Sequence, residues 1–107
     1  RVLFRSPRPP PYGTVVQAEA EGRDEAGAPL RAGLRVTHPD GYRLTAAAAA
    51  ACLLQWWDGS LREPGLHLQA LAADPARMLR DLRSMGAGLQ GRGVDLPSLL
   101  SETTAAF

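Results

Sequence analysis

The 107-residue sequence contains no lysine, asparagine or isoleucine, and its only cysteine is Cys52. Codons for the three missing residue types all begin with AA or AT, which indicates a GC-rich, bacterial genome. The same codon bias favours alanine and arginine, so their abundance says little about function. A single cysteine excludes an internal disulfide, and nothing points to an oxidising compartment. We therefore expect a cytoplasmic protein.

Long apolar runs and a strong excess of charge are also missing. The longest apolar run covers nine residues, 46–54, whereas a membrane-spanning helix needs ~20. No secretory signal pattern opens the chain. The net charge of +1 gives no reason to expect nucleic acid as a partner. With 45% hydrophobic residues, the composition is that of a small globular domain without a membrane span.

The first residues differ from the rest of the chain. Residues 1–6, RVLFRS, match one reading frame of a widely used sequencing-library adapter, with a genuine terminal strand as the alternative. If they derive from an adapter, the natural protein continues upstream of Pro7 and the chain is a C-terminal fragment. Residues 7–13 form a proline-rich, extended lead-in.

Two segments with alternating polarity follow, VVQAEAE at 15–21 and LRAGLRVT at 30–37. This period predicts half-buried strands, and the turn-forming residues between them predict an antiparallel hairpin with its apolar face inward. Opposite charges are expected to face each other across its polar side, where they form a solvated surface. These charges are Glu19, Glu21, Arg31 and Arg35.

Six consecutive alanines after Thr45 predict a helix that ends near Gly59. Alanine is the best helix former, and Thr45 is a good N-cap residue. Because alanine is small, this helix is expected to lie close to the sheet, with Cys52 as a small buried residue within it.

The second half predicts another strand and another helix. PGLHLQAL, residues 64–71, alternates like a strand, and DPARMLRDLRSMG, residues 74–86, has an Asp-Pro start and a glycine stop. The resulting order β-β-α-β-α predicts an α+β domain over 14–89, with helices on one face of a mixed sheet. Residues 90–107 are expected to be a glycine-rich segment and tail.

The candidate binding residues lie at the start of the alanine helix. The backbone amides of Ala46 and Ala47, with the hydroxyls of Tyr42 and Thr45, resemble an anion site at a helix N-terminus. Plain capping by Thr45 is the alternative. His67, on the polar side of its expected strand, is a further candidate for substrate binding.

Two other kinds of site are not supported by spacing. GAGLQG, residues 86–91, matches the dinucleotide pattern G-x-G-x-x-G, but it follows a helix, whereas a cofactor loop follows a strand. We therefore expect this chain to bind no NAD(P). The histidines, acidic residues and cysteine show no metal-ligand spacing, and no metal site is expected.

A family resemblance extends the interpretation. VTHPDGYRLTAAAAAACLLQWWDGS (36–60) and PGLHLQALAADPARMLRDLRSMG (64–86) resemble the C-terminal part of saccharopine dehydrogenase-like oxidoreductases. The resemblance covers about residues 13–89. It implies an N-terminal Rossmann domain that binds NAD(P), missing from this chain, and hydride transfer to a substrate that the motifs do not specify.

No catalytic residue of that family has a counterpart here, so the fragment alone is expected to be inactive. A homodimer is left open. The alternative hypothesis is a stand-alone, non-enzymatic α+β module for binding or oligomerisation.

Overall fold

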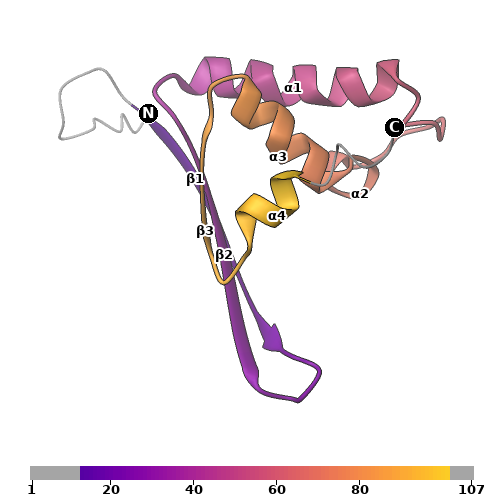
Figure 1. Cartoon of the computed structure of the whole chain (residues 1–107). Coiled ribbons are helices and arrows are strands. Elements are labelled where there is room, and N and C mark those ends of the chain that lie inside the picture. Colours follow the sequence, from indigo (N-terminus) through magenta and orange to yellow (C-terminus); the bar gives the residue numbers. More distant parts are fainter. Residues whose placement is uncertain (1–12, 102–107) are drawn as a thin grey trace, which may run out of the picture.

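The computed structural model describes residues 13–101, so the expectations for residues 1–12 and for 102–107 lie outside the described residues. This described part of the chain contains three strands and four helices (Figure 1). In order they are β1 (Thr14–Arg23), β2 (Pro29–His38), α1 (Gly41–Trp57), α2 (Gln69–Ala72), α3 (Pro75–Ser84), β3 (Gly88–Arg92) and α4 (Leu96–Ser101). The predicted α+β class is confirmed.

The hairpin is the longest part of the sheet. β1 pairs antiparallel with β2 over ten residues each. Glu21 lies opposite Arg31, as predicted, but Glu19 lies opposite Gly33, and Gln17 takes the place opposite Arg35. In Figure 1 the tip of the hairpin extends well beyond the helices.

The third strand is not the one predicted. Residues 64–71 form no strand: they run from an irregular connection into the short helix α2. The third strand is β3, which pairs antiparallel with β2 and places Leu89 opposite Val36. The sheet order is therefore β1-β2-β3, and the sheet is antiparallel throughout rather than mixed. The alternation of Leu66 and Leu68 was misleading, because both side chains are exposed.

Close packing explains the glycines in and after β3. A Cβ atom on Gly91 would lie 2.8 Å from Cγ of Leu96, the first residue of α4. Gly93 has a φ of 65°, and a Cβ there would collide with the carbonyl oxygen of Arg31. These glycines let the chain turn tightly beside the sheet.

The alanine helix begins earlier than predicted. Asp40 is its N-cap: its Oδ1 accepts hydrogen bonds from the amides of Tyr42 at 2.9 Å and Arg43 at 3.3 Å. The prediction of Thr45 as N-cap is wrong, because Thr45 lies in the second turn and its hydroxyl donates to the Gly41 carbonyl at 3.0 Å. Helix α3 matches its prediction, with Asp74 as N-cap, Pro75 at the first position and Gly86 just past its end.

The core lies between the helices and the adjoining end of the sheet. Its buried members are Leu44, Ala47, Leu82 and Ala87, and Val36 of β2 packs against them. Helix α1 buries a single stripe along its length, Leu44, Ala47, Ala51 and Gln55. Most of its contacts are with α3, and fewer are with β2. The alanines therefore bring α1 close to a helix more than to the sheet.

Candidate functional site

The anion site predicted at the start of the alanine run is not formed. Because the helix begins at Gly41, the amide of Leu44 already donates to the Asp40 carbonyl at 3.1 Å. Ala46 and Ala47 lie further along α1, where backbone amides are used within the helix. Ala47 is also buried, while Tyr42 is 91% exposed. The four residues therefore offer no common set of free donors.

His67 lies apart from that group. It belongs to the connection between α1 and α2, and its Nε2 is 3.2 Å from the Pro64 carbonyl oxygen. It lines a depression together with Trp56 and Cys52 from the C-terminal half of α1. Cys52 is half-buried rather than buried, and its sulfur accepts a hydrogen bond from Gln69.

Between residues 13 and 101, no group of three or more His, Cys, Asp or Glu residues is arranged to hold a metal ion. No helix in the same part of the chain is long and apolar enough to cross a membrane.

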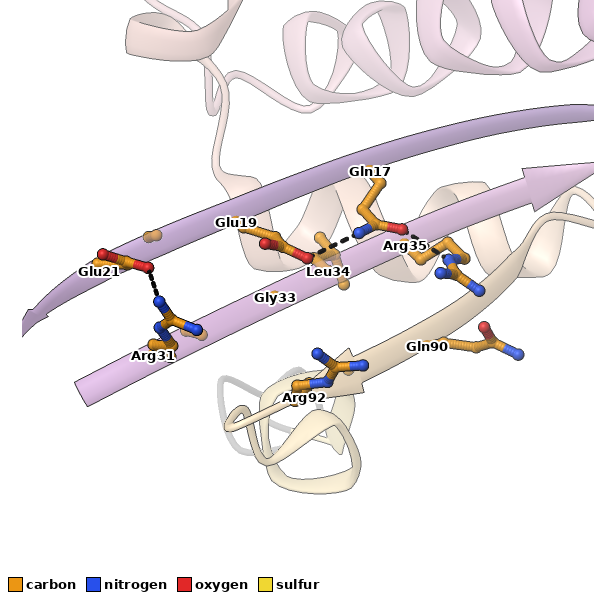
Figure 2. Close-up of a pocket in the computed structure, with 12 residues that line it drawn as sticks. Gln17, Glu19, Glu21, Arg31, Gly33, Leu34, Arg35, Gln90 and Arg92 are labelled. Carbon is orange, nitrogen blue, oxygen red and sulfur yellow. Dashed lines mark hydrogen bonds and ion pairs between the residues drawn. The ribbon is translucent and has the colours of Figure 1, made fainter. Parts of the chain in front are cut away.

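The polar face of the sheet carries a group of polar and charged side chains that line a pocket (Figure 2). The strand register aligns them in three rows across the sheet. The rows are Gln17–Arg35–Gln90, Glu19–Gly33–Arg92 and Glu21–Arg31. Gly33 has no side chain, so the centre of this grid is open, and together the rows line a cavity of about 200 Å³. We call it the Gly33 hollow.

Gln17 organises one side of the Gly33 hollow. Its Nε2 donates to Glu19 at 2.8 Å, and its Oε1 accepts from Arg35 Nε at 2.9 Å. The amide thereby stands between the Glu19 carboxylate and the Arg35 guanidinium. In the third row, Arg31 and Glu21 form an ion pair of 2.5 Å, with both side chains largely exposed.

The other side of the hollow comes from β3. Among residues 13–101, the side chains of Arg92 and Gln90 make no hydrogen bond or ion pair. The sequence predicted the charges of the hairpin but not these two neighbours, because β3 itself was missed. The polar positions 90 and 92, either side of a glycine, were the only signal for them.

A second polar cluster joins the end of α1 to α3. Asp58 accepts hydrogen bonds from the Ser60 hydroxyl at 2.6 Å and the Ser60 amide at 3.0 Å, and it pairs with Arg77. These donors, Ser60 above all, lower the pKa of Asp58 from 3.8 to about 2. Arg77 also pairs with Asp81 within α3, at 3.5 Å. This cluster connects the end of α1 to α3.

Gln55 makes a second connection between the same helices. Its side chain is fully buried. Its Oε1 accepts from the Asp74 amide at 2.9 Å, and its Nε2 donates to the Asp74 carbonyl at 3.2 Å. The Gln55 side chain on α1 thus holds the backbone of Asp74, the N-cap residue of α3.

Comparison of the chain with family models, with curated proteins and with solved structures gives no match. The resemblance to saccharopine dehydrogenase-like proteins therefore depends on the sequence motifs quoted above.

Proposed function

We propose that this chain is the C-terminal, substrate-side part of a cytoplasmic, saccharopine dehydrogenase-like oxidoreductase. In this proposal a Rossmann domain elsewhere in the same protein binds NAD(P), and the chain contributes sheet and helices to the substrate side. The motif resemblance supports the family, and the unburied apolar surface described next supports the role.

The observation that carries the proposal is an apolar depression beside the C-terminal half of α1. It is lined by Trp56, Leu66, Leu68 and Leu71, whose exposed fractions are 61%, 102%, 73% and 83%. Large apolar side chains gathered in this way are typical of a surface that another part of a protein covers. We assign that role to the missing Rossmann domain.

The order of elements around the glycine pattern GAGLQG, residues 86–91, also supports a substrate-side role. A dinucleotide loop leads from a strand into a helix, so that the helix N-terminus meets the pyrophosphate. Here the order is reversed, because Gly86 lies just past the end of α3 and the chain then enters β3. Hydride transfer would therefore need a cofactor held by another domain.

The experiment compares this chain with the protein encoded by the longer upstream reading frame. We expect the longer protein to bind NADPH in a nicotinamide-fluorescence titration and the 107-residue chain not to bind it. A longer protein that does not bind NADPH would contradict the oxidoreductase proposal.

The docking role has its own test, in the variants Leu66→Glu and Leu68→Glu. In the 107-residue chain both side chains are exposed, so each change should shift the free energy of unfolding by less than ~0.5 kcal/mol. In the longer protein the same changes should lower the melting temperature clearly. Equal, small effects in both proteins would show that nothing covers the depression.

A stand-alone module for binding or oligomerisation is the second candidate, because β1 leaves one edge free. All ten residues of β1 pair with β2, and no strand among residues 13–101 lies on the other side of β1. Such an edge can accept a further strand. An upstream start codon close to Pro7, with no Rossmann fingerprint, would favour this candidate.

A further inference from the structure

We propose that the Gly33 hollow binds the carboxylate group of a small molecule. The site lies on the sheet face opposite the helices, since Val36 packs into the core and neighbouring strand residues point to the other side. The proposal is independent of the oxidoreductase function, because it depends only on side chains within this chain.

The shape of the site comes from one missing side chain. Gly33 is flanked across the sheet by Glu19 and Arg92 and along its own strand by Arg31 and Arg35. A Cβ atom at this position would have no neighbour closer than 3.8 Å. A larger residue would therefore fit here without a clash, and with glycine the space above the strand stays open. In Figure 2, Glu19, Arg31 and Arg92 lie around this position, and Arg35 lies further along β2.

The donors of the site lie on β2 and β3. Arg35 and Arg92 are diagonal neighbours in the register, close enough for long side chains to meet over one ligand. Arg35 uses its Nε for Gln17, which orients the guanidinium and leaves its terminal N–H groups for another acceptor. Arg92 has no partner among residues 13–101.

The carboxylates of the face are already engaged. Glu21 pairs with Arg31, and Glu19 accepts from Gln17. Neither carboxylate forms an ion pair with Arg35 or Arg92. Arg35 and Arg92 are therefore diagonal neighbours without an ion-pair partner among residues 13–101, and an oxyanion between them would accept from the donors that both leave free.

Glu19 indicates which oxyanion fits. It borders the open centre directly opposite Arg92, so at the same position it repels a doubly charged phosphate about twice as strongly as a singly charged carboxylate. A planar carboxylate also matches the fork of a guanidinium, and the Gln90 amide at the rim can donate to it. The chemistry therefore favours a monocarboxylate.

The test is an NMR titration of the chain with sodium propionate at constant ionic strength. We expect saturable shifts of the Gly33 amide and of the Nε–H signals of Arg35 and Arg92. Arg35→Gln and Arg92→Gln should each weaken binding by at least about fivefold, because each removes charged donors.

Arg23→Gln is the matched control. Arg23 lies at the end of β1, outside the residues that line the hollow, and its side chain donates to the Gly27 carbonyl at 2.9 Å, so its loss should change the affinity by less than about twofold. Shifts that do not saturate, or an equal weakening in all three variants, would overturn the proposal and reduce the effect to general attraction by a basic surface.

Inorganic phosphate near neutral pH provides the second arm. We expect it to bind more weakly than propionate, and Glu19→Gln to improve phosphate binding more than propionate binding. Phosphate binding as tight as propionate binding in the unmodified chain would overturn the assignment to a carboxylate.

Discussion

Replacing Gln55 by leucine should remove a large part of the stability of this chain. The Asp74 amide would lose its hydrogen bond to Gln55 Oε1, and an amide left without a partner costs about 1–3 kcal/mol. The Asp74 carbonyl still accepts from the Met78 amide at 2.9 Å. Loss of its hydrogen bond from Gln55 Nε2 therefore costs only about 0.5–1.5 kcal/mol. We therefore expect Gln55→Leu to lower the free energy of unfolding by about 1.5–4.5 kcal/mol, against a total of ~5–15 kcal/mol for a typical domain.

The measurement is urea unfolding followed by circular dichroism, with Gln69→Leu as the matched control. Gln69 is also a glutamine that bonds across helices, to Cys52, but its bond is exposed. Its replacement should cost less than ~0.5 kcal/mol. If Gln55→Leu were no more destabilising than Gln69→Leu, the reasoning about the α1–α3 connection would be refuted.

Gln55→Glu adds a pH signature to the same prediction. The introduced carboxyl group can still accept from the Asp74 amide, but it can donate to the Asp74 carbonyl only when protonated. Burial and this donor role should raise its pKa in the folded state above the ~4.3 of an unfolded chain. The variant should therefore approach the stability of the unmodified chain at acid pH and lose stability as pH rises through the raised pKa.

Three further predictions concern α1 and its ends. Ala51→Leu, at a fully buried position, should cost about 1–3 kcal/mol by overpacking, while Ala49→Leu, at an exposed position, should be nearly neutral in the same urea titration. Asp40→Ala should cost about 1 kcal/mol through loss of the N-cap, and Thr45→Ala less than ~0.5 kcal/mol; the reverse order would restore Thr45 as the cap. Because the pKa of Asp58 falls from 3.8 to about 2 in the folded chain, its contribution is present above pH 3.8 and lost towards pH 2; Asp58→Asn should flatten that part of the stability profile.

The elements with local signals were predictable from the sequence. The hairpin follows from alternation on both sides of a turn, and α3 follows from Asp74, Pro75 and Gly86 at its ends. The start of α1 was misplaced because the stretch has two good cap residues, Asp40 and Thr45. The six alanines drew attention to the second, although the residues between them are all tolerated in a helix.

β3 could not be predicted because its stability is not local. Its five residues include Gly88 and Gly91, which carry no alternation and weaken strand propensity. What makes it a strand is the free edge of β2, about 50 residues earlier in the chain. The Gly33 hollow was missed for the same reason, since Arg92 and Gln90 join the hairpin residues only when β3 is paired.

The distance between β2 and β3 along the chain has a consequence for the order of folding. The hairpin closes over a short turn, whereas Val36 meets Leu89 only after a loop about eight times longer is closed, which costs ~2 kcal/mol more in chain entropy. The hairpin is therefore expected to form first, and β3 to dock late, after α1 and α3 have assembled. Until then the inner edge of β2 is unpaired and can be captured by any extended segment, so the docking of β3 decides when this edge is protected.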